Sequence, residues 1–353
     1  MLNLRKLIRQ NQLTSFKRNN FLRLDKNERS FKFENKILNK IKNLISSSLI
    51  QSYPENIYDL KKIISKKENI DSRFISITPG ADGALKYIFE LFKLNKTKNI
   101  VTLFPTYAML EVYSKIFQFK LKKIPRSLSK DISNKDFIKH SANFIYLANP
   151  NMPDGQIIEK EQILSLIKKL KRKKILLVID ETYINFSSHD SLKDLVKRHK
   201  NLIIIKSLSK SLGIAGLRLG YLIANPNYLN LIDKIKPLAD ISSLSAEIAI
   251  ILLKNKKYQK DYLEEIEKSK KFVKVQCQQL NLDLIETETN FFHLIFKNKF
   301  NEIQKKLEQN KILVRKNRIL INNNFQKTLR ITYSNRKNMN FFFKKLKIVL
   351  NKI

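Results

Sequence analysis

Residues 207–220, with the sequence SLSKSLGIAGLRLG, decide which fold this chain adopts. They follow an apolar, β-branched run at 202–206 that predicts a strand, and they place one lysine, Lys210, among hydroxyls and glycines. A lysine that forms a Schiff base needs a protected setting that lowers its pKa, and small neighbours leave room for a flat cofactor. Three polar side chains of the stretch suit a phosphate group through charge-assisted hydrogen bonds: Ser207, Ser209 and Arg218. The alternative is a surface lysine in a glycine-bearing turn, but the whole spacing is hard to obtain by chance.

The glycines of the chain gather in three short stretches. There are only six, namely Gly80, Gly83, Gly155, Gly213, Gly216 and Gly220. A chain this poor in glycine keeps the residue where a side chain would obstruct the backbone. We therefore interpret each stretch as part of one site.

Short apolar runs alternate with helical patterns over the first two thirds of the chain. Amphipathic helices are expected at 84–94 and 159–172, and the candidate strands are 74–78, 99–104, 143–148, 175–180, 202–206 and 219–223. Continuous apolar strands that alternate with helices predict a mostly parallel sheet covered on both faces. The fold class expected for this part is therefore α/β.

The pattern changes after about residue 245. A long charged helical stretch at 246–280 leads to short apolar runs at 291–296, 312–315 and 328–333, and a final helix starts near 336. This pattern predicts a smaller α+β domain. We expect three parts, with these boundaries: an N-terminal arm that packs with the small domain (1–35), a large cofactor-binding domain (36–245) and a small C-terminal domain (246–353).

The composition of the chain indicates its cellular location and excludes some classes of protein. The chain has 353 residues, 43% of them apolar, which is enough for a sizeable core, and no run approaches the ~18–20 apolar residues of a membrane span. The N-terminal residues lack the apolar stretch of a secretory signal, and the single cysteine, Cys277, allows no internal disulfide. We expect a cytoplasmic protein with no membrane partner. The histidines lack metal-ligand spacing, so no metal site is expected at any of them: His140, His189, His199 and His293.

The net charge is +38, from 69 Lys and Arg against 31 Asp and Glu. Such a balance is typical of nucleic-acid-binding proteins. The lysines are nevertheless scattered through nearly every expected helix, and no zinc-finger, RNP-like or basic-zipper signature accompanies them. We favour a basic enzyme surface that attracts anions, with no nucleic-acid partner.

A second segment, VIDETY at 178–183, ends an apolar strand with Asp180. A carboxylate at the carboxyl end of a strand points into the crevice where α/β folds bind ligands. Opposite a pyridine nitrogen it would keep that nitrogen protonated, which makes the ring an electron sink, and Tyr183 could donate to a ring hydroxyl. On its own, Asp180 is more often an ordinary helix N-cap.

The residues that follow three other expected strands give weaker indications of a ligand site. At 77–85, ITPGADGAL combines a strand, a tight turn and a helix N-terminus, which is a natural phosphate site. At 104–107, FPTY places Tyr107 where an aromatic ring could stack on a cofactor, although a packed core tyrosine is equally common there. At 149–155, NPNMPDG has the dense turn residues of a functional loop.

Together these segments resemble the fold-type I pyridoxal-phosphate aminotransferases, and among them the histidinol-phosphate aminotransferase branch. The resemblance begins at LDKNE (24–28), continues through YPE (53–55) and ends at LRIT (329–332). It covers most of the chain in family order, and residues 207–220 are its most specific part. The resemblance implies the pyridoxal-phosphate-transferase fold of type I.

The resemblance also implies a role for each residue around the cofactor, pyridoxal 5′-phosphate. Lys210 holds it as the internal aldimine and moves the proton between the substrate Cα and the cofactor carbon. Asp180 pairs with the pyridinium, Tyr183 with the ring oxygen, and Tyr107 stacks on the ring. The phosphate group is surrounded by Ala81, Asp82, Ser207, Ser209 and Arg218.

A homodimer and a substrate site follow from the same resemblance. Tyr53 resembles the tyrosine that reaches the phosphate of the neighbouring subunit's cofactor. Arg330 resembles the arginine that binds the substrate α-carboxylate, a task that suits a planar bidentate donor. Alternation places Arg330 on the strand face opposite Leu329 and Ile331, and the alternative is a solvent-facing arginine. Asn27 lies in the arm that approaches the substrate.

The chain departs from the family pattern at several positions. Met152 stands where the family has a second asparagine that bonds the ring oxygen, so this contact is missing unless Asn151 or Tyr183 supplies it. Three other departures are Asp154 for a threonine, Gly83 for a glutamate, and Arg29-Ser30 for asparagine–proline. The cofactor framework survives these changes, but they weaken the assignment of histidinol phosphate as the substrate.

The leading hypothesis is a pyridoxal-phosphate-dependent aminotransferase that acts on an amino acid or a phosphorylated amine, with a 2-oxo acid as acceptor. A pyridoxal-phosphate-dependent decarboxylase of a phosphorylated amino acid uses the same lysine, and the sequence barely separates the two. A basic nucleic-acid-binding protein on an inactive scaffold is the alternative from another class. The intact set of Lys210, Asp180 and Tyr183 argues against it.

Overall fold

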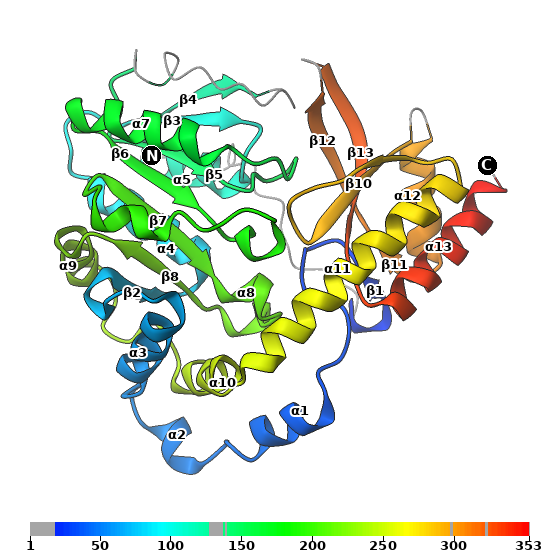
Figure 1. Cartoon of the computed structure of the whole chain (residues 1–353), viewed down its shortest axis with the longest axis horizontal. Helices are drawn as coiled ribbons and strands as arrows, with labels where there is room; N and C mark the ends of the chain where they lie inside the picture. Colours follow the sequence, from blue (N-terminus) through cyan, green and yellow to red (C-terminus); the bar gives the residue numbers. More distant parts are fainter. Residues whose placement is uncertain (1–17, 127–136, 138–139, 297–298, 322–323, 353) are drawn as a thin grey trace.

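The computed structural model describes residues 18–126, 137, 140–296, 299–321 and 324–352. Figure 1 shows two bodies side by side, one built on a large sheet and the other on a small sheet. The long helix α11 (Lys256–Gln279) runs from the large body along the small one (Figure 1). No helix within the described residues is long and apolar enough to cross a membrane.

Seven strands form the large sheet, in the order β2-β8-β7-β6-β5-β3-β4. Their bounds are β2 Ile75–Thr78, β3 Asn99–Phe104, β4 Lys120–Pro125, β5 Phe144–Ala148, β6 Leu176–Asp180, β7 Leu202–Ser207 and β8 Gly220–Ala224. Strand β8 is antiparallel to both of its neighbours, and the other neighbouring pairs are parallel. The predicted mostly parallel sheet is confirmed, and each predicted strand lies within one residue of its observed bounds. The sequence does not predict β4, KLKKIP, because an edge strand needs no continuous apolar run.

Alternate residues of the central strands enter two hydrophobic clusters, one on each face of the sheet. In β6, Leu177 and Ile179 join one cluster, whereas Val178 joins the other. Helices on the Leu177 face are α3 (Ile57–Glu68), α7 (Lys160–Arg172) and α10 (Ser243–Lys254). Helices on the Val178 face are α4 (Gly80–Phe92), α5 (Ala108–Ile116) and α9 (Pro226–Ile235). Because Asp180 lies two residues after Val178, its side chain belongs to the α4 face.

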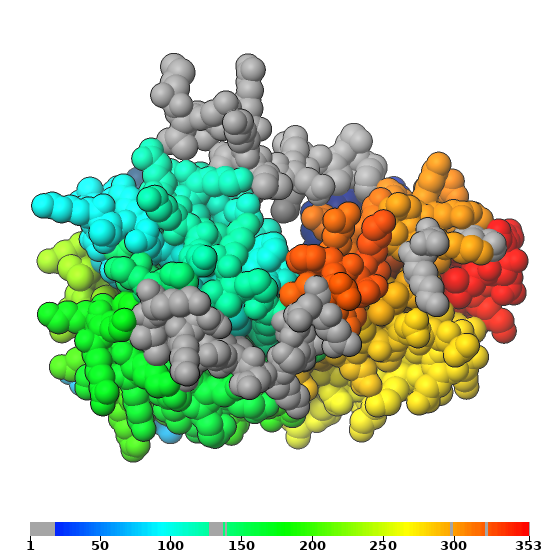
Figure 2. All heavy atoms as spheres, turned by 90° about the horizontal axis from the view of Figure 1, so that it is seen from above, coloured from blue at the N-terminus to red at the C-terminus, as the bar shows by residue number. Residues whose placement is uncertain are grey.

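The small sheet has the antiparallel order β12-β13-β10-β9. Its strands are β9 Asp283–Ile285, β10 Phe291–Ile295, β12 Arg315–Ile321 and β13 Asn324–Thr332. A third hydrophobic cluster joins this sheet to α11, α12 (Phe300–Gln309) and α13 (Arg336–Leu350). Figure 2, which views the molecule from above, shows the orange hairpin of β12 and β13 beside the cyan and green part of the chain.

The N-terminal arm lies against the small sheet. Strand β1 (Leu22–Arg23) pairs in parallel with β11 (Ile312–Leu313), and Leu24 enters the third hydrophobic cluster. The chain then runs along the lower edge of the molecule as α1 (Asn35–Lys42) and α2 (Ser47–Gln51) before it reaches the large sheet (Figure 1).

Two expectations about the C-terminal part are wrong in detail. The helical stretch expected at 246–280 is interrupted at Asn255, whose side chain accepts a hydrogen bond from the Tyr258 backbone and so begins a new helix. The expected strand at 312–315 ends at Leu313, and Arg315 already belongs to β12, which pairs with a different strand. Local periodicity cannot distinguish these divided elements from continuous ones.

Candidate active site

Lys210 lies on the short helix α8 (Leu208–Ser211), which starts directly where β7 ends. The Ser207 side chain caps this helix by accepting a hydrogen bond from the Ser209 backbone N–H at 3.2 Å. The Lys210 Nζ donates to the backbone oxygen of Lys26 at 3.1 Å. Burial, reinforced by the positive charge of Arg330, lowers the pKa of Lys210 to about 8.

Asp180, at the end of β6, is a buried carboxylate held by two neutral donors. The Tyr146 hydroxyl donates to its Oδ2 at 2.8 Å, and the Thr182 backbone N–H donates to its Oδ1 at 2.9 Å. Burial raises the pKa of Asp180, and both hydrogen bonds oppose this rise. The hydrogen bond from the Thr182 N–H is the local contact that an N-cap aspartate makes. Asp180 therefore stabilises the turn after β6, and its carboxylate still lies at the carboxyl edge of the sheet.

Sequence reasoning missed Tyr146. It lies two residues before the end of β5, on the same face as Ala148, which is opposite Asp180 in the sheet. A tyrosine in an otherwise apolar run, FIYLA, was the signal that could have found it, because a buried phenol needs a hydrogen-bond partner.

Three successive residues of the N-terminal arm contact three side chains of the site. The Asp25 carbonyl accepts from Arg330 Nη2 at 2.8 Å, and the Lys26 carbonyl accepts from Lys210 Nζ. The Asn27 Nδ2 donates to the Tyr183 hydroxyl at 2.9 Å. The sequence predicts only Asn27 among these contacts.

Arg330 is buried beside Tyr183, on the face of β13 that looks away from Leu329 and Ile331. Its partners are the Asp25 carbonyl and the Met152 thioether at 3.4 Å, neither of which carries a charge. Its Nε meets no acceptor within the described residues. Burial lowers the pKa of Arg330 to about 10, and the nearby Arg315 charge acts in the same direction. A buried guanidinium with an unused donor is suited to receive a carboxylate.

The N-terminus of α4 and Arg218 together form a cradle. A Cβ at Gly80, where φ is +76°, would lie 3.3 Å from the Arg218 guanidinium. A Cβ at Gly220 would lie 2.7 Å from the Gly80 carbonyl carbon and 2.9 Å from the Ala81 nitrogen, so only glycine allows these segments to approach. Free N–H groups at a helix N-terminus beside a guanidinium favour a phosphate.

Tyr107 contacts Asp82, which lies in the first turn of α4. The Tyr107 hydroxyl donates to Asp82 Oδ1 at 3.5 Å. Burial raises the pKa of Tyr107, and the charges of Asp82 and Asp180 raise it further. The structure therefore brings Tyr107 near both Asp82 and Asp180. Ser207 and Ser209 are both buried, and Ser207 pairs with Gly220 of β8 in the sheet.

Polar groups of the loop 149–155 form hydrogen bonds within the loop and with neighbouring segments. Asn151 Nδ2 donates to the Pro105 carbonyl at 3.0 Å and to Asp154 Oδ1 at 2.9 Å. His293 is fully buried and its Nε2 contacts the Pro153 carbonyl at 2.8 Å, while burial lowers its pKa to about 3. His293 is thus a neutral structural residue, and the described residues contain no group of three or more side chains placed to bind a metal.

Tyr53 is the one predicted site residue that a single chain leaves away from the others. It is 86% exposed and follows α2, which Figure 1 places at the outer edge of the molecule, away from α8.

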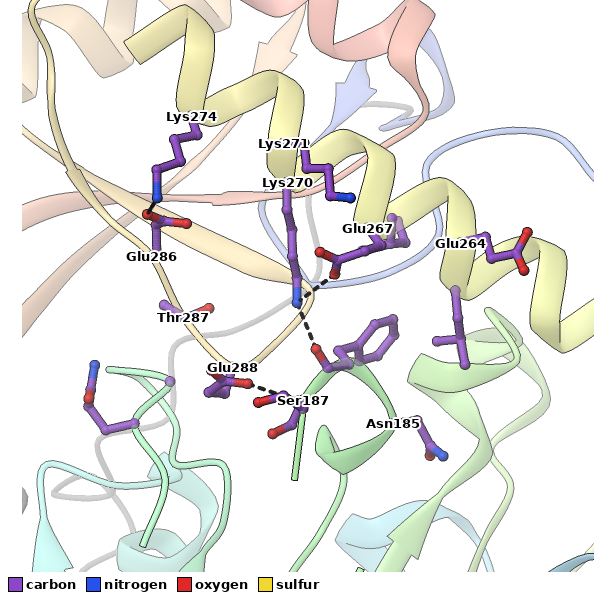
Figure 3. Close-up of a pocket in the computed structure, with 16 residues that line it drawn as sticks. Asn185, Ser187, Glu264, Glu267, Lys270, Lys271, Lys274, Glu286, Thr287 and Glu288 are labelled. Atoms are coloured by element: carbon purple, nitrogen blue, oxygen red, sulfur yellow. Dashed lines mark hydrogen bonds and ion pairs between the residues drawn. The ribbon is translucent and has the colours of Figure 1, made fainter. Parts of the chain in front are cut away.

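A separate cavity of about 740 Å³ lies between α11 and the segment that follows β6, as Figure 3 shows. None of its lining residues belongs to the set around Lys210. Two of its lining lysines have partners: Lys270 Nζ donates to the Phe186 carbonyl at 2.7 Å, and Lys274 pairs with Glu286 at 2.9 Å (Figure 3).

The family model described as aminotransferase class I and II matches residues 16–346. The chain belongs to this family. The aminotransferase is 31% identical to the histidinol-phosphate aminotransferase of Brachyspira hyodysenteriae over 316 residues, which covers 88% of this chain and 87% of the relative. It is also 31% identical to the histidinol-phosphate aminotransferase of Clostridium novyi over 323 residues, covering 89% and 88%.

Solved structures share the fold of the aminotransferase. The histidinol-phosphate aminotransferase of Sinorhizobium meliloti in complex with pyridoxal-5′-phosphate has a TM-score of 0.83 at 23% identity, with 94% of this chain and 91% of that chain covered. The L-threonine-O-3-phosphate decarboxylase of Porphyromonas gingivalis has a TM-score of 0.79 at 22% identity, covering 94% and 99%. The predicted fold type, the enzyme class and the family are confirmed.

Pyridoxal 5′-phosphate is the cofactor of this aminotransferase. The residues present fit its three polar parts. The cradle of α4 and Arg218 suits the phosphate, the buried Asp180 carboxylate suits a ring nitrogen, and Lys210 offers an amine with a lowered pKa.

Proposed function

We propose that this aminotransferase exchanges an amino group between histidinol phosphate, or a closely related phosphorylated amine, and a 2-oxo acid. The observation that carries the substrate proposal is the buried Arg330, which has an unused Nε donor and no charged partner among its hydrogen-bond contacts. Arg315 lies opposite Arg330 in the β12–β13 pair and adds a second positive charge. Two adjacent guanidinium groups suit substrates that carry a carboxylate or a phosphate. The names of the relatives support histidinol phosphate as the amine.

We propose the following residues as holders of the cofactor. Lys210 would hold it covalently, Asp180 would pair with its ring nitrogen, Tyr183 with its ring oxygen, and Tyr107 would stack on its ring. Its phosphate would contact the cradle and the hydroxyls beside it, through Ala81, Asp82, Ser207, Ser209 and Arg218. When bound, pyridoxal 5′-phosphate supplies an electron sink for charge that develops at the substrate carbon.

The residues of the chain then orient the substrate and move one proton. When it is not bonded to the cofactor, the buried Lys210 amine, whose pKa is lowered, is suited to take a proton from the substrate carbon and return it. Arg330 binds the carboxylate and so fixes the substrate relative to Lys210. The backbone carbonyls of Asp25 and Lys26 hold the arm against Arg330 and Lys210.

The purified holoenzyme, supplied with histidinol phosphate and 2-oxoglutarate, should produce glutamate. Carbon dioxide release from a phosphorylated amino acid, without glutamate formation, would establish decarboxylation instead. Borohydride reduction followed by peptide mapping should place the cofactor on Lys210. Label on another lysine would refute the site assignment.

We propose further that two chains form a homodimer with shared sites. Apolar side chains of the segment that contains α1, α2 and the start of α3 are exposed in one chain: Leu38, Ile45, Ile50, Tyr53 and Tyr58. Obligate dimers bury such surfaces in interfaces of more than ~2,000 Å². Tyr53 would then reach the phosphate of the neighbouring subunit's cofactor.

Mixed dimers test this arrangement. A Tyr53→Phe subunit mixed with a Lys210→Ala subunit should give a dimer in which the intact lysine site keeps the tyrosine of its partner, whereas the phosphate contact is lost at the inactive site. The mixture should therefore bind cofactor at its lysine sites more tightly than the Tyr53→Phe homodimer. A stable and fully active monomer in sedimentation would refute the proposal.

The three-part division at residues 35 and 245 is our proposal for the domains. The third hydrophobic cluster supports it, because this cluster gathers the small sheet, its helices and Leu24 of the arm. We also propose a cytoplasmic location, since the single cysteine, Cys277, is buried with a free thiol and needs no oxidising compartment.

A further inference from the structure

At position 152 the loop 149–155 has no amide that could donate to the ring oxygen of a bound cofactor. Met152 presents a thioether at the position where the family pattern leads us to expect an asparagine. The adjacent Asn151 does not replace it, because its amide is used by the Pro105 carbonyl and Asp154. If the ring oxygen receives a hydrogen bond in place of the one from the family's asparagine, the donor must come from another part of the chain.

Asn27 places an amide beside this gap. Its side chain is 1% exposed, and its Nδ2 lies 2.9 Å from the Tyr183 hydroxyl and 3.9 Å from the Met152 sulfur. A thioether can only accept a hydrogen bond, so the Met152 sulfur fixes the nitrogen of the amide, and not its oxygen, on this side. The Thr332 hydroxyl lies 3.4 Å from the amide oxygen on the other side.

The backbone of Asn27 is also held in one conformation. Its φ of +54° is in the left-handed region, which asparagine tolerates better than most residues. Its N–H donates to Thr332 Oγ1 at 3.0 Å, and its carbonyl accepts from Asn290 Nδ2 at 3.2 Å. The amide is therefore presented to Tyr183 by a rigid support that reaches from the arm to β13.

We propose that Asn27 is a positioning residue that directs the hydroxyl hydrogen of Tyr183 to the ring oxygen of the cofactor. Because the Tyr183 oxygen accepts the Asn27 amide hydrogen, its own hydrogen is left for another acceptor. Asn27 thereby compensates for the amide that Met152 replaces. The inference rests on the proposed contact between Tyr183 and the cofactor.

The absorbance of the bound cofactor reports this contact when it is titrated with pH. The nitrogen that links Lys210 to the cofactor shares its proton with the ring oxygen. A donor to that oxygen stabilises its negative charge and so lowers the pKa of the linking nitrogen. Loss of one such hydrogen bond corresponds to a pKa rise of about 1–2.

Four variants separate the contributions. Tyr183→Phe should raise the spectroscopic pKa by about 1–2, and Asn27→Gly should raise it by about half as much. Glycine is chosen because it accepts the positive φ. Adding Asn27→Gly to Tyr183→Phe should produce no further rise, because Asn27 acts through the phenol. Adding Met152→Asn to Asn27→Gly should restore the value to within about 0.3 of the wild type.

Asn27→Asp keeps the shape of the side chain and the tolerance of a positive φ, but its carboxylate can only accept. It should draw the Tyr183 hydrogen away from the ring oxygen and raise the spectroscopic pKa at least as much as Asn27→Gly. Ser30→Ala is the matched control, since it removes the hydrogen bond of 2.7 Å between Ser30 and Ser334, which ties the arm to the small domain without touching Tyr183. It should lower the melting temperature and leave the spectroscopic pKa unchanged.

The outcomes separate the inferred role of Asn27 from the proposed contact between Tyr183 and the cofactor. An unchanged spectroscopic pKa in Tyr183→Phe would refute the contact between Tyr183 and the cofactor. A rise in Tyr183→Phe with none in folded Asn27→Gly and Asn27→Asp would refute the role of Asn27 alone. Equal rises from Asn27→Gly in the presence and absence of Tyr183 would show that Asn27 acts on the cofactor directly, which also overturns the inference. Met152→Asn alone should lower the spectroscopic pKa, and no response would show that position 152 does not face the ring oxygen.

Discussion

Replacement of Asp180 by asparagine should have opposite effects on the stability of the cofactor-free protein and on catalysis. The folded, cofactor-free protein holds the Asp180 proton more tightly than the unfolded chain does, because burial raises the pKa of this carboxyl. The stability linked to a raised carboxyl pKa is present at low pH and is lost as the pH rises through that pKa. Neutral pH lies above the ordinary pKa of an aspartate, so the raised pKa of Asp180 is a cost of folding there, and Asp180→Asn should raise the melting temperature of the cofactor-free protein.

In the proposed site the cofactor would reverse this balance, because its positive ring nitrogen would pair with the carboxylate. Tyr146 at 2.8 Å and the Thr182 N–H at 2.9 Å already donate to Asp180. Asparagine preserves the shape of the side chain: its oxygen can accept from Thr182, and its NH2 group can donate to the Tyr146 hydroxyl, which can also accept. The loss is then that of one partner in a buried charge pair, about 3–5 kcal/mol. This range corresponds to a decrease in kcat/KM of roughly 150-fold to 5,000-fold.

Thermal melts with and without pyridoxal 5′-phosphate, together with steady-state kinetics, check both halves of this prediction. Asp180→Asn should show a smaller rise in melting temperature on addition of cofactor than the wild type. Asp194→Asn is the matched control, because its exposed carboxylate pairs only with Lys197 at 3.3 Å across one helical turn. Near-normal activity of Asp180→Asn would show that this carboxylate is only a local cap.

Three further changes have defined outcomes. Arg330→Lys should raise the KM of the carboxylate-bearing partner by roughly 10-fold to 150-fold, since an ammonium cannot donate from two parallel N–H groups, and unchanged kinetics in both half-reactions would contradict the role of this residue. Glu181→Gln removes the charge partner of the buried Lys206 at 2.8 Å and should lower the free energy of unfolding in urea by about 3–5 kcal/mol, whereas a loss below about 1 kcal/mol would mean that Lys206 is solvated. Gly155→Ala should lower the melting temperature, because φ is +70° there and the new Cβ would overlap the Thr287 side chain; a Thr287→Ala change should relieve part of this effect, and an undisturbed Gly155→Ala protein would contradict the close approach of the two segments.

The large sheet could be predicted from the sequence because its central strands are short apolar stretches that can be recognised one at a time. Strand β6 is an aliphatic run that ends in Asp180. Strand β7 begins with four aliphatic residues and ends at Ser207, three residues before Lys210. Fully buried parallel strands need such runs, and their carboxyl ends must meet at one edge. Lys210 and Asp180 could therefore be placed together from the sequence alone.

The contacts of the arm could not be predicted, because they join residues far apart in the chain. Asn27 and Tyr183 are separated by 156 positions. Lys26 contacts Lys210 through its backbone carbonyl, a group that every residue type has, so the sequence cannot indicate this contact. Arg29, noted only as a departure from the family pattern, lies among the rings of four aromatic residues: Phe31, Phe33, Tyr258 and Tyr262. Such packing depends on tertiary structure and leaves no periodic signal.

The parallel pairing of β1 with β11 also constrains the order in which the protein can assemble during its synthesis. Leu22 is translated among the first residues, yet its strand partner, Ile312, emerges near the end of the chain. The large sheet can form while the ribosome is still making the C-terminal part of the chain, because the last strand of this sheet ends at Ala224. The arm then has no sheet to join, and Asp25, Lys26 and Asn27 reach the site only after the C-terminal hairpin is complete. Contacts with so large a sequence separation form late and slowly. A nascent chain that stops before residue 312 should consequently hold a folded sheet with an open, incompetent site.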